Sequence, residues 1–249
     1  MLFPPPGRAA LLLLAAVVAP APPASAGLHL TWNDCAQGSG ASPNLDFACS
    51  SSSGQSALFC AFTLAQPVDS VLGVEIVVDL QHGSPVLPDW WRFEAGGCRE
   101  KLLRADDGLG DTDCLNPWTG GAAGGVATLE QGMPRGAPNQ LRIKVTLGVP
   151  SSEPRSLEAS TMYNAARILI SHGSTSSCGG CAEGACLVLN SILIRRPPRP
   201  EGAPSTDVRL EEPGAGTLNW ATWQGGGGAA CESVPTRAAT WGAIKRLYR

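Results

Sequence analysis

Residues 141–147 have the sequence Leu-Arg-Ile-Lys-Val-Thr-Leu, in which apolar and polar side chains alternate without interruption. Successive side chains of a β-strand point to opposite faces of the sheet, so the four aliphatic residues are predicted to face a core. Arg142, Lys144 and Thr146 are then predicted to face water. One buried face and one wet face are typical of an antiparallel sheet.

Similar patterns extend this prediction along the chain. Residues 71–80 alternate in the same way, with Glu75 and Asp79 predicted to point outward, although Val77 interrupts the polar side. Further strands are predicted at 58–64, 126–129, 166–170, 187–194 and 218–224. Clusters rich in Gly, Pro, Ser and Asn separate these segments, and no strand–helix–strand alternation occurs. We therefore predict an all-β fold, an antiparallel β-sandwich of Ig-like, cohesin-like or jelly-roll type with roughly eight strands, stapled by disulfides.

The first 26 residues have the features of a signal peptide. A single charge, Arg8, precedes the apolar run 9–18, and Ala24-Ser25-Ala26 matches the small-x-small pattern that signal peptidase cleaves. The alternative is an uncleaved anchor, but the apolar run has about ten residues where a spanning helix needs roughly 20. We expect cleavage after Ala26 and a protein that is secreted, periplasmic or held at the cell surface.

The remaining chain is predicted to have three parts. Residues 27–196 form the sandwich, residues 197–217 a Pro- and Gly-rich linker, and residues 218–249 a C-terminal strand with a short amphipathic tail. In that tail, Trp241, Ile244 and Tyr248 recur at helical spacing. This tail has two alternative roles. It either docks on the sandwich or serves as an export or attachment tag.

The charge of the chain argues against nucleic acid as a partner, and its hydropathy argues against a transmembrane segment after the signal peptide. The sequence has 18 Lys and Arg against 21 Asp and Glu, a net charge of −3, and its basic residues are scattered. A phosphate backbone requires a basic stripe, so nucleic acid is not expected as a partner. No segment after the signal peptide is apolar over the length of a transmembrane helix.

Nine cysteines, all after residue 26, predict a disulfide framework, because disulfides persist outside the cytoplasm. Cys60 is the expected leftover thiol, since it sits inside the apolar run 58–64. The eight candidates for disulfides are Cys35, Cys49, Cys98, Cys114, Cys178, Cys181, Cys186 and Cys231. Proximity suggests the pairs Cys35–Cys49 and Cys98–Cys114, as a hypothesis.

The cysteines near the C-terminus also allow a different chemistry. Cys178, Cys181, Cys186 and Cys231 could supply the four thiolates of a tetrahedral zinc site. An oxidising compartment favours disulfides over thiolates, so zinc is the alternative here and not the main prediction.

An acidic loop is the candidate for calcium. Its carboxylates are separated by Gly108 and Gly110, which gives both oxygen ligands and backbone freedom. The candidate ligands are Asp106, Asp107, Asp111 and Asp113. A solvated acidic loop without an ion is the alternative, and no other cofactor is expected.

A pair of adjacent tryptophans is the candidate for ligand contact. If residues 90–93 form a strand, Trp90 and Trp91 point to opposite faces, so Trp90 could be exposed and stack on a sugar ring. The alternative places Trp91 and Phe93 in the core, with Trp90 covering a sheet edge.

No catalytic constellation is visible, and we predict that the protein is not an enzyme. His29, His82 and His172 lie outside any nucleophile-elbow or metal-helix motif. The main prediction is a structural or binding module of unknown ligand, whose partner is a surface protein or a polysaccharide. The first alternative is a carbohydrate-binding or adhesive domain that uses Trp90 and calcium, and the second is a secreted hydrolase.

Four local patterns together carry a resemblance. They are Trp32-Asn33-Asp34-Cys35, Leu87-Pro88-Asp89-Trp90-Trp91, the Cys-x-x-Cys-x4-Cys cluster from Cys178 to Cys186, and Thr240-Trp241-Gly242-Ala243-Ile244-Lys245. Across residues 27–249 the chain resembles a group of uncharacterised secreted bacterial proteins. That resemblance implies export and a single architecture and assigns no site. A weaker resemblance, through residues 71–80 and 167–170, is to cohesin-like β-sandwiches.

Overall fold

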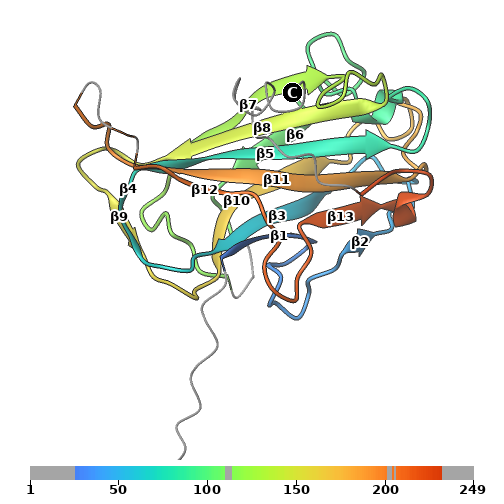
Figure 1. Ribbon diagram of the computed structural model, residues 1–249. Helices are drawn as coiled ribbons and strands as arrows, with labels where there is room; N and C mark the ends of the chain where they lie inside the picture. The colour runs from blue at the N-terminus through green and yellow to red at the C-terminus, as the bar shows by residue number, and fades with distance from the viewer. Residues whose placement is uncertain (1–25, 110–113, 201–203, 205, 232–249) are drawn as a thin grey trace, which may run out of the picture.

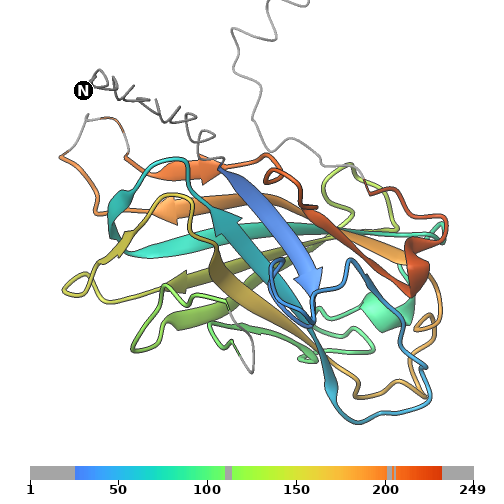
Figure 2. The same ribbon diagram turned by 90° about the horizontal axis from the view of Figure 1, so that it is seen from below.

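The computed structural model describes residues 26–109, 114–200, 204 and 206–231. Two β-sheets face each other across one core, as Figures 1 and 2 show from the front and from below. This arrangement confirms the predicted disulfide-stapled all-β sandwich. The predicted signal peptide and the amphipathic tail lie outside the described residues.

Sheet A has the strand order β1-β3-β10-β6, and every pair in it is antiparallel. Its strands are β1 (Gly27–Trp32), β3 (Gln55–Thr63), β10 (Tyr163–Ser171) and β6 (Leu103–Asp106). A separate two-stranded sheet pairs β4 (Val68–Val71) with β9 (Arg155–Leu157).

Sheet B has the order β2-β13-β11-β5-β8-β7, with β12 added beside β11. Its strands are β2 (Asn44–Leu45), β13 (Trp220–Trp223), β11 (Ala185–Arg195), β5 (Gly73–His82), β8 (Gln140–Gly148), β7 (Ala123–Gln131) and β12 (Val208–Leu210). All of its pairs are antiparallel except β2 with β13. The 3₁₀ turns η1 (Asp89–Trp91) and η2 (Gln224–Gly226) lie in connecting segments.

Strand β8 confirms the prediction made for residues 141–147. Its four aliphatic side chains are buried, whereas Arg142 and Lys144 are half-buried and Thr146 is exposed on the outer face. The inner faces of both sheets supply a continuous aliphatic and aromatic core. Among the described residues, no helix has the length and hydropathy of a membrane span.

The prediction that residues 197–217 form a linker outside the sandwich is wrong, because Val208–Leu210 form strand β12 of sheet B. Strand β12 pairs with the second half of β11, as in Ile192 opposite Leu210, and β13 pairs with the first half. Strand β11 is 11 residues long and therefore has room for both partners along one edge. The described residues after 205 thus belong to the sandwich.

Candidate functional site

Four disulfides lock the sandwich: Cys35–Cys114, Cys49–Cys181, Cys98–Cys178 and Cys186–Cys231. The eight predicted cysteines are therefore confirmed, and so is Cys60 as a buried free thiol. Because such bonds persist only in oxidising surroundings, this is the framework of a protein that works outside the cytoplasm.

The predicted pairings Cys35–Cys49 and Cys98–Cys114 are wrong. The bonds that form span sequence separations of 45 to 132 residues, because strand pairing brings distant loops together at the ends of the sandwich. The zinc alternative is also wrong, since Cys178, Cys181 and Cys186 each bond a different partner and leave no thiolate. Asp34 lies close to the sulfurs of Cys35 and Cys114, but that pair is likewise oxidised.

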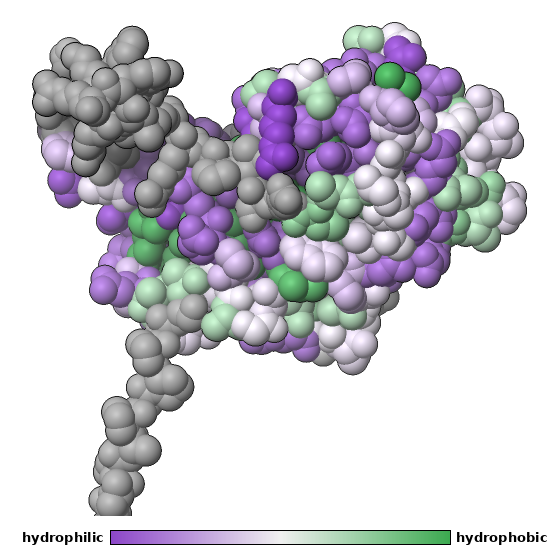
Figure 3. Space-filling view, turned by 45° about the vertical axis from the view of Figure 1, so that its right-hand side comes forward, coloured by the Kyte–Doolittle hydropathy of each residue, from purple (hydrophilic) through white to green (hydrophobic). Residues whose placement is uncertain are grey.

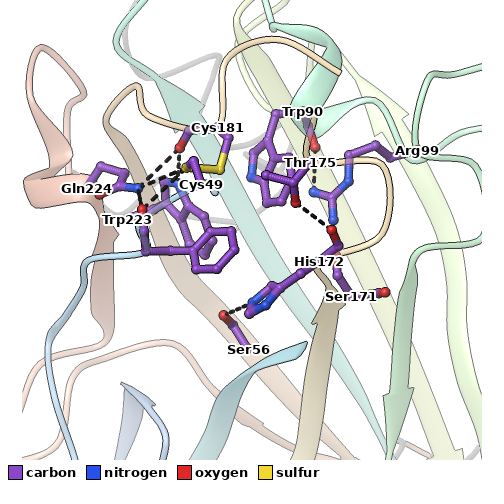
Figure 4. Close-up of a disulfide and its surroundings, with 11 residues drawn as sticks. Cys49, Ser56, Trp90, Arg99, Ser171, His172, Thr175, Cys181, Trp223 and Gln224 are labelled. Atoms are coloured by element: carbon purple, nitrogen blue, oxygen red, sulfur yellow. Dashed lines mark hydrogen bonds between the residues drawn. A yellow bond between two sulfur atoms is a disulfide. The ribbon is translucent and has the colours of Figure 1, made fainter. Parts of the chain in front are cut away.

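Trp90 is completely buried, which contradicts its prediction as an exposed platform. Residues 89–91 form the turn η1 and not a strand, so Trp90 and Trp91 both enter the core. The Trp90 ring packs against Trp223 at a centroid distance of 5.6 Å, next to the Cys49–Cys181 disulfide shown in Figure 4. Among the described residues, Trp220 on β13 is the one tryptophan that is not fully buried.

Arg99 is a buried cation within this aromatic cluster. Its guanidinium carbon lies 3.3 Å from the centroid of the Trp90 ring, and Nη1 donates to the Trp90 carbonyl at 2.9 Å. Nη2 donates to the carbonyl of Ser171 at the end of β10 (Figure 4). Burial lowers the pKa of Arg99 to about 9, so the group remains charged at neutral pH. Carbonyl oxygens and the ring face thus hold the charge and tie η1 to sheet A.

A serine and a histidine meet below Trp90, where β3 begins and β10 ends (Figure 4). Ser56 Oγ lies 2.8 Å from His172 Nε2, and His172 Nδ1 lies 3.1 Å from the carbonyl oxygen of Ser53. A carbonyl only accepts, so Nδ1 carries the proton and Nε2 accepts from the serine hydroxyl. Burial lowers the pKa of His172, which favours this neutral form.

This pair has the orientation of a nucleophile and its base, with a carbonyl as the third group. It was missed in the sequence because the two residues are 116 positions apart and belong to no motif. Ser56 is only 6% exposed, and the Phe47 ring stacks on His172 at 3.9 Å. The hydroxyl is therefore closed off from bulk solvent.

The acidic loop uses two of its carboxylates for structure. Asp106 forms two hydrogen bonds with the guanidinium of Arg167, at 3.1 and 3.2 Å. Asp107 accepts from the backbone N–H of Ala122 at 2.8 Å. The other two candidates, Asp111 and Asp113, lie outside the described residues.

The outer face of sheet B carries a shallow groove of about 300 Å³, which we call the sheet B groove. Its polar lining is Glu75, Thr128, Arg142, Lys144, Thr146, Ser191 and Arg209. Ion pairs with neighbouring strands fix the positions of two of these cations. Lys144 on β8 lies 2.6 Å from Glu130 on β7, and Arg142 on β8 contacts Asp79 on β5 at 2.7 and 2.8 Å. The side visible in Figure 3 is mostly hydrophilic, with hydrophobic residues in small separate spots.

Comparison with protein-family models, with curated proteins and with solved structures gave no match to this chain.

Proposed function

We propose that this protein is a non-catalytic binding module that acts outside the cytoplasm and binds a surface polysaccharide along the sheet B groove. The observation that carries the proposal is the polar lining of the groove, which is held in place by ion pairs between neighbouring strands. Arginine and lysine donate hydrogen bonds, glutamate accepts them, and serine and threonine do both. A ligand rich in hydroxyl groups can use all of these partners.

The rigid frame supports this role. Strands β11, β5, β8 and β7 form the floor of the groove. The Cys49–Cys181 and Cys186–Cys231 disulfides anchor the beginning of β11. Side chains that are already ordered lose little conformational entropy on binding, which favours affinity. The buried Trp90 leaves no stacking platform there, so hydrogen bonds and ion pairs must supply the recognition.

The test is binding of the exported protein to an array of bacterial cell-surface polysaccharides. We expect at least one to bind and the Lys144→Met variant to bind it about tenfold more weakly, which corresponds to about 1.4 kcal/mol. Lys101→Met is the matched control, because Lys101 is 88% exposed and lies outside the groove. No binding to any polysaccharide, or equal weakening in both variants, would overturn the proposal.

A second function is favoured by the contact between Ser56 and His172. In an acyl hydrolase, Ser56 Oγ would attack the substrate carbonyl while its proton moves to His172 Nε2, and His172 would pass that proton to the alcohol or amine that leaves as the bond to the acyl carbon breaks. Water would then attack the acyl-serine and give a proton to His172, which returns it to Ser56 Oγ as the carboxylic acid is released. This candidate requires Phe47 to move away from His172. A fluorophosphonate probe that labels the folded wild type but not Ser56→Ala would establish it, and no labelling would exclude it.

A further inference from the structure

Trp220 differs from the other tryptophans that the structure describes, because its side chain is not in the core. Strand β13 has one inner and one outer side: Ala221 and Trp223 are buried core residues, whereas Trp220 and Thr222 are half-buried. Every other tryptophan in the described ranges is 0% exposed. Trp220 therefore projects from the outer face of sheet B, beside the first half of β11 in Figure 1.

The Trp220 indole has no protein partner in the described part of the chain, where its side chain forms no hydrogen bond and no aromatic contact. By contrast, Trp32, Trp118 and Trp223 each donate the indole N–H to a backbone carbonyl, at 2.7 to 2.9 Å. A tryptophan joins a broad apolar ring to one hydrogen-bond donor. At Trp220 both of these groups are open to a ligand.

The strand register places Trp220 in line with the sheet B groove. Trp220 lies opposite Val188 on β11, which in turn lies opposite Asp79 on β5. Asp79 lies opposite Arg142 on β8, and Arg142 lines the groove. Neighbouring strands are about 4.8 Å apart, so the backbones at Trp220 and Arg142 are about 14 Å apart on one face. Val188 is only 3% exposed, so the indole is the apolar group that a ligand meets at this end.

The charges of the groove lining are paired, which bears on the class of polymer. Each charged residue of the lining has a partner of opposite charge outside the lining. These pairs are Glu75–Arg195, Arg142–Asp79, Lys144–Glu130 and Arg209–Glu211. An acidic polymer would bring its own carboxylates next to the acidic partners, and like charges repel. A neutral polymer meets no such repulsion and can use the hydroxyl, amino and guanidinium groups as hydrogen-bond partners.

We propose that Trp220 stacks on a sugar ring of the polysaccharide that the sheet B groove binds, a role that rests on the proposed function of that groove. The polymer is a neutral chain of hexoses whose ring hydroxyls are equatorial, as in β-linked glucose. Such a ring has C–H bonds on both faces, which pack against the face of an indole. Its hydroxyls lie at the ring edge, where they can accept from the indole N–H and, further along the chain, bond the polar lining of the groove.

The test is calorimetric titration of the full exported chain with cellohexaose, a soluble hexamer of β-linked glucose. We expect the wild type to bind it, Trp220→Ala to bind about tenfold more weakly, and Trp220→Phe to lie between the two because it keeps a ring. Leu115→Ala is the matched control, since Leu115 is an apolar side chain that is 55% exposed and lies beside sheet A, and its affinity should be unchanged. The mannose hexamer of the same linkage has an axial hydroxyl on each ring, and the wild type should bind it more weakly than cellohexaose.

A spectroscopic measurement separates contact with the sugar from a structural role. In the full chain with isotope-labelled tryptophan, the indole N–H signal of Trp220 is the one that Trp220→Phe lacks. It should shift when cellohexaose is added, whereas the signals of the buried tryptophans should stay in place.

Three results would overturn the proposal. If cellohexaose binds and Lys144→Met weakens it but Trp220→Ala does not, the groove binds the polymer without Trp220. If cellohexaose does not bind while an acidic polysaccharide does, the proposed function of the groove stands and the role of Trp220 fails. If no polysaccharide of any kind binds, both fail. Loss of fold in Trp220→Ala would be seen as a changed circular dichroism spectrum, and the indole signal of the wild type then decides.

Discussion

Replacing Asp79 by alanine removes the acceptor that joins three central strands on the outer face of sheet B. The Asp79 carboxylate on β5 accepts two hydrogen bonds from Arg142 on β8, at 2.7 and 2.8 Å, and one from Asn190 on β11. The Asp79 side chain is 7% exposed and that of Arg142 is 13% exposed. The variant therefore leaves a mostly buried guanidinium without its counter-charge.

Breaking a buried pair by removing one partner costs about 3 to 5 kcal/mol. For a domain of this size that corresponds to a fall in Tm of roughly 6 to 20 °C. The matched control is Asp89→Ala, because the Asp89–Arg92 pair is 52% and 42% exposed and such pairs contribute about 0 to 1 kcal/mol.

The assay is urea unfolding followed by tryptophan fluorescence, with thermal melts as a second measure. The double variant Asp79→Ala, Arg142→Met should recover part of the loss, because it removes the unpaired charge as well. If Asp79→Ala lowers the free energy of unfolding by no more than Asp89→Ala does, Asp79 does not stabilise the pairing of β5, β8 and β11 in this way.

Three further outcomes are expected. Burial raises the pKa of the Cys60 thiol from 9.0 to about 12, so at pH 8 it holds about a thousandfold less thiolate than an exposed cysteine. An excess of Ellman's reagent should therefore detect no thiol in the folded protein and one after unfolding; a rapid native reaction would contradict the burial. Burial also lowers the pKa of His29 from 6.5 to about 4, so below pH 6.5 the unfolded chain binds a proton that the folded chain does not. Stability should fall as the pH drops from 6.5 to 4, by up to about 3 kcal/mol, and a urea series on His29→Gln should show a shallower slope. Replacing Cys98 and Cys178 together by alanine removes a disulfide that spans 80 residues, and the chain-entropy model predicts that the free energy of unfolding falls by about 4.5 kcal/mol. A fall of less than about 1 kcal/mol in urea titrations would refute that model for this disulfide.

Local pattern was a reliable guide to where the strands lie. The alternation of residues 141–147 requires only that neighbouring side chains point to opposite faces, and β8 has the predicted buried and wet sides. The apolar run around Cys60 likewise predicted a buried thiol. Asp79 was correctly placed on the outer face, but its burial by Arg142 and Asn190 depends on three strands and could not be seen in one.

The predicted disulfide pairs and the predicted exposure of Trp90 were wrong because both relied on local sequence alone. Cys35 lies 14 positions before Cys49 but bonds Cys114, because the loops that carry cysteines meet only after both sheets have formed. Trp90 was placed on a strand, whereas the turn η1 sends it and Trp91 into the same core.

The sequence by itself determined the all-β class, the main strands, the eight bonded cysteines and the one buried thiol, because these depend on side-chain period and on composition. Only the tertiary structure decided the disulfide pairs, the burial of Trp90 and the contact of Ser56 with His172. Each of these depends on which distant segments lie side by side. That is fixed by how the strands pair and how the two sheets close over one core, and no local pattern records it.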